Sequence, residues 1–279
     1  MLEWLKDRSV LSITGKTAVR FLNNMVTNDL SSQLYSYNYM LSPQGRFLYD
    51  FFVYKLSDEE FWIDVHSLFV DSLVEKLSLY NIRKEVEIKN ISANYSILYS
   101  QLSLLPKNDN KEIVFTNQDP RFHKMGFRLL VKTSYAQNLE VSSEELYVTD
   151  KYENSIPDGI SDLMFNQSLV VYFGVEELSA VSYSKGCYIG QEVVSRAKYQ
   201  GTLRKKLFKI ISGTKIAPME LGNNIIDLSG DKIGIFCSSH NNIGIALLEE
   251  EKYLKLDKKI AIINGSQEVE IEVPIWRRE

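Results

Sequence analysis

The side chain best suited to chemistry in this sequence is the thiol of Cys187, which lies in the run K-G-C-Y-I-G-Q-E at 185–192. A thiol reacts as its thiolate, and a neighbouring cation or a helix N-terminus favours that form. Lys185 supplies a cation, and the run QEVVSRAKY from Gln191 onward predicts a helix. Gly186 and Gly190 are suited to a positive φ or to a close ligand. Cys187 is therefore a candidate functional thiol, although a buried thiol in a glycine-rich turn explains the same residues.

The other thiol and the imidazoles offer no second site of this kind. Cys237 lies in the run KIGIFC, which predicts a strand, and we interpret it as structural. Two cysteines without a C-x-x-C pair exclude a disulfide framework, and one chain lacks the four thiolates that usually hold an iron–sulfur cluster. His66, His123 and His240 are far apart in the sequence and have no nearby group of acids or thiols. We expect no tightly bound metal within one chain.

The charge pattern limits the ligands. A net charge of −4 gives no general basic field for nucleic acid or a membrane surface. One local cluster of cations is present, formed by Arg196, Lys198, Arg204, Lys205, Lys206 and Lys209. Solvated strand and loop faces explain such a cluster, and so does a seat for carboxylates or phosphates. We favour a small polyanionic tail over RNA and expect no direct nucleic-acid partner.

The sequence predicts neither export nor membrane insertion. Its first residues, MLEWLKDRSVLSITGK, carry an acid at position 3 and lack the apolar block of a signal peptide. No run reaches the eighteen apolar residues that a spanning helix needs. We predict a cytoplasmic protein without a membrane partner.

The elements that must position the motif mix strands and helices without strict alternation, which predicts an α+β fold. We predict strands at 10–14, 47–54, 61–65, 86–91, 95–100 and 127–132. Helices are predicted after Gly15, over roughly 67–80, and from Ser142 to about 153, where Ser142 and Glu145 have capping-box spacing. The segment 155–168 contains Pro and Gly and predicts a loop just before the motif.

After Gly201 the patterns indicate strands and turns only, which predicts a small antiparallel β-barrel. Asn264-Gly265 between alternating apolar runs predicts a hairpin. Val269 and Ile271 alternate with glutamates, as in a strand with one solvated face. We therefore divide the chain into residues 1–202, with two α+β subdomains, and a barrel domain over 203–279.

The motif at 185–192, followed by Arg196, Ala197, Lys198, Tyr199 and Gly201, resembles the signature of the YgfZ family. These are folate-binding proteins, similar in fold to the glycine-cleavage T-protein, that assist iron–sulfur cluster assembly or repair. The resemblance covers nearly the whole chain and includes FLNNMVTNDL at 21–30, LSPQGRFLYDFFVY at 41–54, LYNIRKEVEI at 79–88, DPRFHKMGFRLL at 119–130 and IPDGISDL at 156–163. These segments look most similar to the branch with the mitochondrial cluster-assembly factor.

The resemblance implies a ring of three subdomains, with tetrahydrofolate in a central channel and a barrel at the C-terminus. Matching the related T-proteins position by position places Tyr37 and Glu153 at the pteridine, and Arg204 or Lys205 at the folate tail. For the motif it implies a functional Cys187, positioned and tuned by Lys185, Tyr188 and Arg196, in a loop shaped by Gly186 and Gly190 and continued by Gln191 and Glu192.

The function implied is folate-dependent help in the maturation or repair of iron–sulfur proteins, including cluster enzymes that modify tRNA. Cys187 would share a cluster with thiolates of a partner, and an A-type carrier scaffold is the partner expected first. A folate-dependent aminomethyl or one-carbon transferase is the alternative, and a binding module with folate as a structural plug is a third. T-proteins carry two aspartates after the Gly45 loop and use the first. Here the pair is Tyr49-Asp50, which argues against aminomethyl transfer unless the register shifts by one residue.

Overall fold

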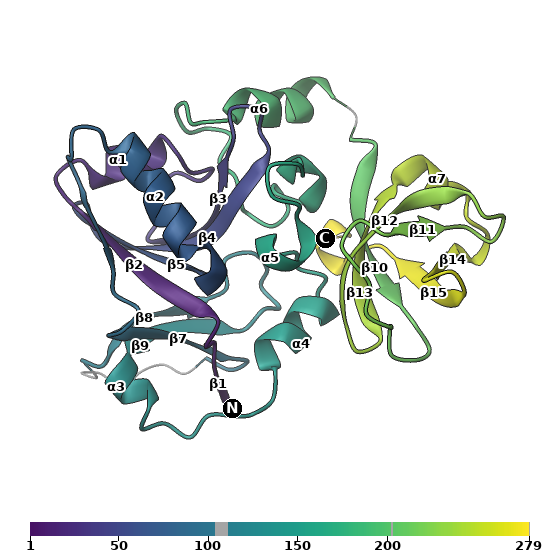
Figure 1. Ribbon diagram of the computed structural model, residues 1–279, viewed down its shortest axis with the longest axis horizontal. Coiled ribbons are helices and arrows are strands. Elements are labelled where there is room, and N and C mark those ends of the chain that lie inside the picture. Colours follow the sequence, from purple (N-terminus) through teal and green to yellow (C-terminus); the bar gives the residue numbers. More distant parts are fainter. Residues whose placement is uncertain (104–110, 202, 279) are drawn as a thin grey trace.

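The computed structural model describes residues 1–103, 111–201 and 203–278. It contains two antiparallel sheets and a closed barrel, with the barrel at the opposite end of the molecule from α1 and α2 (Figure 1). The predicted α+β class with a C-terminal antiparallel barrel is confirmed. Among the described residues, no helix has the length and apolar content needed to cross a membrane.

The first sheet has five strands in the order β3-β4-β5-β2-β6. Its strands are β2 (Arg8–Thr14), β3 (Tyr35–Leu41), β4 (Phe47–Ser57), β5 (Glu60–His66) and β6 (Glu87–Asn90). One face packs against α1 (Ala18–Asn23) and α2 (Val70–Tyr80) through residues such as Leu22, Leu73 and Leu77. Successive side chains of a strand point to opposite faces, so Phe51 joins this core while Phe52 joins the core on the other face.

The second sheet has four strands in the order β1-β7-β9-β8. Its strands are β1 (Leu2–Trp4), β7 (Tyr95–Ser100), β8 (Ile113–Gln118) and β9 (Phe127–Lys132), and the helices α3 (Thr133–Ala136), α4 (Leu146–Glu153) and α5 (Gly159–Asp162) follow. A single apolar cluster joins both sheets, α4 and the barrel through Phe52, Ile97, Tyr152 and Leu247. The two sheets, α4 and the barrel therefore share one apolar core.

The barrel closes in the order β10-β13-β12-β11-β14-β15. Its strands are β10 (Lys205–Ile211), β11 (Asn224–Ile226), β12 (Lys232–His240), β13 (Ile243–Glu249), β14 (Ile260–Ile263) and β15 (Gln267–Glu272). Asn264 and Gly265 have φ values of 50° and 77° between β14 and β15. Two positive φ angles are the requirement of a tight hairpin turn, so the hairpin prediction is confirmed.

Several predicted elements differ from the observed ones. The barrel region contains a helix, α7 (Glu250–Lys255), so the prediction that it has only strands and turns was wrong. The helix predicted from Ser142 begins at Leu146, because the Ser142 hydroxyl accepts from the N–H of Glu144 and caps no helix. The predicted loop 155–168 contains α5, and strands β3 and β8 were missed. The helix predicted after the motif is present as α6 (Gln191–Gln200). Short 3-10 turns cover Ser67–Phe69, Val170–Phe173, Asp257–Lys259 and Ile275–Arg277.

Candidate functional site

The thiol of Cys187 is exposed on the loop that precedes α6, where it lines a hollow of about 380 Å³. Lys185 and Gly186 line this thiol hollow from the loop, and Arg20 and Asn23 line it from α1. The thiol therefore lies outside the packed core, beside a surface made by a different element of the chain.

Lys185 holds the loop to the end of α1. Its ammonium donates to the carbonyls of Asn23 (2.9 Å), Val26 (2.7 Å) and Asn28 (2.7 Å). An ammonium has three N–H donors, so these carbonyls use all of them. Burial lowers the pKa of Lys185 to about 8, and the carboxylate of Asp29 acts in the opposite direction. The hydrogen bonds of Lys185 go to the backbone, so it positions the loop, and its effect on the thiol stays a prediction.

Tyr188 and Ile189 fasten the same loop. The N–H of Ile189 donates to the carbonyl of Asn24 at 3.1 Å. The ring of Tyr188 is buried, with the ammonium of Lys185 5.0 Å from its centre, and burial raises the pKa of its phenol. Cys187 thus stands exposed between side chains that anchor the loop on either side. The acceptors for this anchoring come from the segment 23–28, within FLNNMVTNDL.

The turn 42–45 packs against the start of α6. A Cβ on Gly190 would lie 2.7 Å from the carbonyl oxygen of Ser42, and a Cβ on Gly45 would lie 2.7 Å from the Cβ of Val193. Both glycines have positive φ, 85° and 70°. Their conformation and this close approach require glycine. A Cβ on Gly186 would meet nothing within 4 Å, so the expectation that Gly186 shapes the loop is not supported by packing.

We expect Gly190→Ala to lower the free energy of unfolding by about 1–3 kcal/mol, because alanine at a positive φ is strained and its methyl group meets the Ser42 carbonyl. Chemical denaturation of the two purified proteins measures the difference. Gly186→Ala is the matched control and should stay within about 0.5 kcal/mol of the wild type. Equal effects of the two substitutions would contradict this account of the loop.

The polar face of α6 is occupied by ion pairs. Glu192 and Arg196 lie four residues apart on α6 and pair at 2.7 Å, and both side chains are exposed. The guanidinium of Arg196 therefore meets Glu192, which corrects the expectation that it positions the thiol. Gln191 closes the turn through its N–H, which donates to the carbonyl of Tyr188 at 3.2 Å.

Most of the local cation cluster is also paired with acids. Lys198 pairs with Glu176, Lys206 with Glu250 at 2.8 Å, and Lys209 with Glu153 at 3.5 Å. Arg204 and Lys205 are exposed at the start of β10. Three of the cations are therefore paired, and Arg204 and Lys205 are the exposed ones at which a ligand tail could bind.

Tyr37 and Asp50 lie inside the molecule and contact each other. The Tyr37 hydroxyl donates to the Asp50 carboxylate at 2.7 Å, and the two side chains are only 2% and 4% exposed. The guanidinium of Arg121 covers the Tyr37 ring at 4.8 Å from its centre. Burial raises the pKa of Asp50, and the nearby carboxylate of Asp158 acts in the same direction. This interior acid is a group that sequence reasoning set aside.

The register of β3 and β4 decides which residue of the pair Tyr49-Asp50 faces the interior. Tyr39 pairs with Asp50 and Met40 pairs with Tyr49, and the register shifts just beyond Met40. Paired residues share a face, so Asp50 faces the same side as Tyr39 and Tyr37, while Tyr49 lies in the core under the helices. The second residue of the pair therefore carries the interior carboxylate. Asp50, and not Tyr49, thus occupies the position from which a carboxylate could act in the interior.

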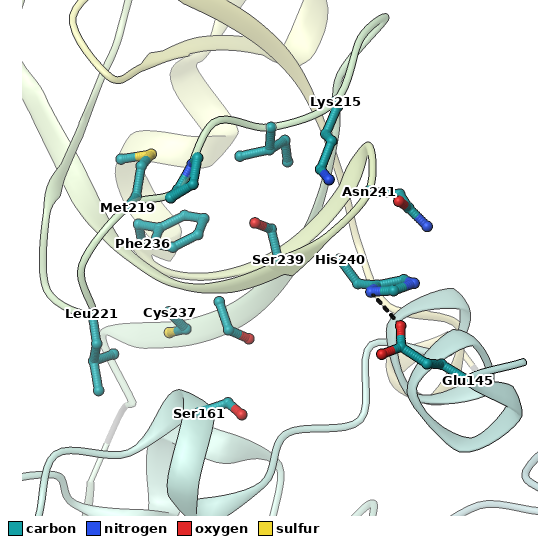
Figure 2. A pocket seen from close by; sticks show the side chains of 13 residues that line it. Glu145, Ser161, Lys215, Met219, Leu221, Phe236, Cys237, Ser239, His240 and Asn241 are labelled. Atoms are coloured by element: carbon teal, nitrogen blue, oxygen red, sulfur yellow. Dashed lines mark ion pairs between the residues drawn. The ribbon is translucent and has the colours of Figure 1, made fainter. Parts of the chain in front are cut away.

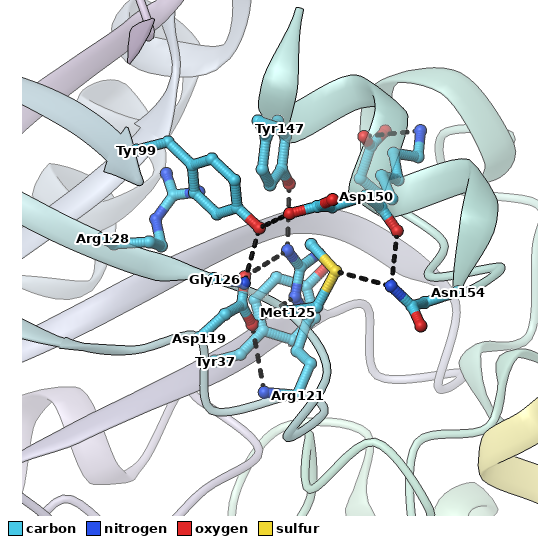
Figure 3. A network of polar contacts seen from close by, with 12 residues as sticks. Tyr37, Tyr99, Asp119, Arg121, Met125, Gly126, Arg128, Tyr147, Asp150 and Asn154 are labelled. Carbon is cyan, nitrogen blue, oxygen red and sulfur yellow. Dashed lines mark hydrogen bonds and ion pairs between the residues drawn. The ribbon is translucent and has the colours of Figure 1, made fainter. Parts of the chain in front are cut away.

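Arg121 belongs to a buried polar network (Figure 3). It donates to both carboxylate oxygens of Asp119 at 2.9 and 2.6 Å and to the Tyr147 hydroxyl at 3.0 Å. The Tyr99 hydroxyl donates to Asp150 at 2.7 Å, beside the same network. Buried charges are costly unless paired, so these contacts fix the interior arrangement. The burial of Asp119 and Arg121 follows only from the fold.

The residues that the resemblance assigns to folate do not meet at one open site. Tyr37 is buried under Arg121, whereas Glu153 is exposed and pairs with Lys209. A pterin has a planar guanidine-like edge that a buried carboxylate such as Asp50 suits. In this structure the guanidinium of Arg121 already lies over the Tyr37 ring. The residues present therefore fit a folate only if Arg121 moves away from the Tyr37 ring. No chemical step is assigned to a bound folate.

A larger hollow of about 560 Å³ lies between the barrel and the helices α4 and α5 (Figure 2). His240 and Glu145 form an ion-pair contact of 3.6 Å at one side of it. Cys237 lines it but is 2% exposed, and burial raises the pKa of its thiol well above the usual value. Cys237 is therefore buried, which agrees with a structural role.

Comparison with known proteins divides the chain into two recognised regions. Residues 7–101 match the GCVT N-terminal domain, and residues 204–279 match the CAF17, C-terminal beta-barrel domain. The human protein named iron-sulfur cluster assembly factor IBA57, mitochondrial, is 28% identical over 98% of this chain and 84% of its own length. The mouse protein of the same name is 26% identical over 88% of this chain and 77% of its own length.

Among solved structures, the glycine cleavage system aminomethyltransferase T from Bartonella henselae is similar in fold. The TM-score is 0.76 at 14% sequence identity, over 98% of this chain and 84% of that chain. The predicted T-protein-like fold is therefore confirmed. At this identity the likeness concerns the fold alone.

Proposed function

We propose, because the chain joins the GCVT N-terminal and CAF17 C-terminal barrel domains of the CAF17/IBA57-type family, that it assists the assembly of iron–sulfur clusters in other proteins. The observation that carries the proposal is the exposed thiol of Cys187, held on an anchored loop beside a hollow. An exposed, anchored thiol suits a metal ligand that a second protein can reach.

The cluster is cargo in this proposal and is shared between two proteins. No group of three or more metal-ligating side chains occurs among the described residues. Since an iron–sulfur cluster usually takes four thiolates, Cys187 supplies one ligand and a partner supplies the others. An A-type carrier scaffold is the partner we propose. The narrower YgfZ-like role, with tRNA-modifying cluster enzymes among the clients in a cytoplasmic setting, is part of the same proposal.

The test is deletion of the gene in its own cells, followed by assay of several iron–sulfur enzymes beside enzymes without clusters. We expect the cluster enzymes alone to lose activity and a plasmid-borne copy of the chain to restore it. Unchanged cluster enzymes in the deleted strain would overturn the proposal.

Tetrahydrofolate binding and folate-dependent one-carbon transfer form a second candidate. The interior carboxylate of Asp50 beside Tyr37 favours it, because a carboxylate and an aromatic ring suit the edge and face of a pterin, and binding then requires Arg121 to leave the Tyr37 ring. Calorimetric titration with tetrahydrofolate should then give a binding signal in the wild type that Tyr37→Ala removes and Cys187→Ser leaves unchanged. The absence of any heat of binding in the wild type would remove this candidate.

A further inference from the structure

The thiol hollow has a second hollow as its neighbour. This second hollow, of about 380 Å³, is lined by Tyr80, Ile82 and Arg83 at the end of α2. Arg20 of α1 and Asn24, which follows α1, line both hollows. The end of α1 is therefore a ridge with Cys187 on one side and the end of α2 on the other. A protein that reaches the thiol also meets this second surface.

The second surface exposes large apolar side chains. Ile82 is 86% exposed, Leu79 is 65% exposed and Tyr80 is 40% exposed. The buried side of α2 is made by other residues, among them Leu73 and Leu77, so these three are not needed for the core. Single exposed apolar residues are ordinary, but three within the four residues 79–82, two of which line a hollow, are typical of an interaction surface.

The turn that carries Ile82 is held in place by hydrogen bonds. The Asn81 side chain donates to the carbonyl of Val86 at 2.7 Å, and the Asn81 carbonyl accepts from the N–H of Lys84 at 2.9 Å. Ile82 is thus presented on a turn that is closed by its neighbours. An ordered surface loses less entropy on binding than a loose one.

The same surface carries an excess of positive charge. Arg20 and Arg83 share one carboxylate, that of Glu85, at 3.0 and 3.9 Å, and Lys84 is exposed beside them. The chain as a whole is acidic, with a net charge of −4, so this excess is local. A cluster held by thiolates is anionic, and an acidic protein that carries one complements this surface.

We propose that the cluster-carrying partner docks on this apolar and cationic face, formed by Arg20, Leu79, Tyr80, Ile82, Arg83 and Lys84, while its cluster reaches Cys187. The inference rests on the proposed function and adds the docking surface and the chemistry of the partner: acidic, with an apolar contact for Ile82. Apolar contacts at the centre of an interface mainly set its affinity, whereas charged residues at the rim mainly set the association rate.

The test measures association of the full chain with a cluster-loaded A-type scaffold protein by calorimetry at low and high salt. We expect Ile82→Glu combined with Arg83→Glu to weaken association at least tenfold, and the wild-type affinity to fall as salt rises. Leu228→Glu, at a 57% exposed apolar residue of the barrel, is the control and should bind as the wild type does. Labelling of Cys187 by a thiol reagent should be equal in all three proteins.

The two proposals fail in distinguishable ways. If Cys187→Ser removes the shared cluster while the double variant associates normally, the docking face is overturned and the cluster role stands. If the wild type does not associate with a cluster-loaded scaffold at all, both the docking face and its premise are overturned. If the wild type alone forms a dimer that Ile82→Glu dissociates, the face binds a second copy of this chain, and the docking proposal is overturned.

Discussion

Cys187→Ser is expected to abolish the cluster-bridged complex and to leave the folded state intact. Serine keeps the size of the side chain but removes the thiolate that binds iron, and the residue is exposed, so packing changes little. The complex should be followed by the visible absorption of the cluster that co-elutes with both proteins. In deleted cells, the variant should restore cluster-enzyme activity no better than an empty plasmid.

Cys237→Ser is the matched control for this substitution. Its sulfur is buried in β12, so serine there should lower thermal stability while the surviving folded protein still forms the complex. A Cys187→Ser protein that still bridges a cluster, or that fully restores the deleted cells, would show that another group is the ligand. The two thiols thus separate a functional effect from a folding effect within one chain.

Asp64→Asn is expected to cost about 3–5 kcal/mol of unfolding free energy, because it leaves two buried guanidinium groups without their counterion. Arg8 donates to Asp64 at 2.5 Å and Arg128 at 2.6 Å, and all three side chains are buried. One nitrogen of Arg128 already lacks a hydrogen-bond partner among the described residues. Urea denaturation at neutral pH measures this difference. Glu192→Gln, which breaks only the exposed pair on α6, should change stability by less than about 0.5 kcal/mol.

The same pair predicts a pH dependence. Desolvation by burial raises the pKa of Asp64, but the guanidinium groups of Arg128 and Arg8 outweigh it and hold the pKa below the ordinary value of 3.8. The unfolded chain then binds the Asp64 proton at a higher pH than the folded protein, so stability falls as pH drops through this range. The difference between wild type and Asp64→Asn should be full above about pH 4 and should narrow below it. A constant difference down to pH 2 would contradict the assigned ion pairs.

The buried network and the anchored loop have different structural roles. The network around Arg121 and Arg128 fixes the interior where the two sheets face each other. The loop at 185–189 is fixed instead by backbone carbonyls of the segment 23–28, which lies on a different element. The interior is therefore held by its polar contacts and shielded from solvent, whereas the loop is held by hydrogen bonds and its thiol is exposed. That combination suits a protein that presents one ligand to a partner.

Local patterns were sufficient for the motif and for those elements whose signals lie within a few neighbouring residues. Asn264-Gly265 predicted its hairpin because two residues with positive φ leave few other structures. The helix after Gly190 and the pair Glu192–Arg196 followed from spacing along one helix, which depends on neighbours within four residues. β3 was missed because its polar residues are buried: the Asn38 side chain accepts from the N–H of Asn28, a contact that no periodicity encodes.

The sequence by itself determined that a thiol stands between two glycines ahead of a helix, and that the chain ends in strands able to close a barrel. The tertiary structure decided which groups meet that thiol and which do not. The ammonium of Lys185 binds backbone carbonyls of the segment 23–28, and Glu153 pairs with Lys209. The strand register decided that Asp50, and not Tyr49, faces the interior. The physical reason is that ion pairs and strand partners join residues far apart in the chain, and their choice depends on packing that local spacing does not specify.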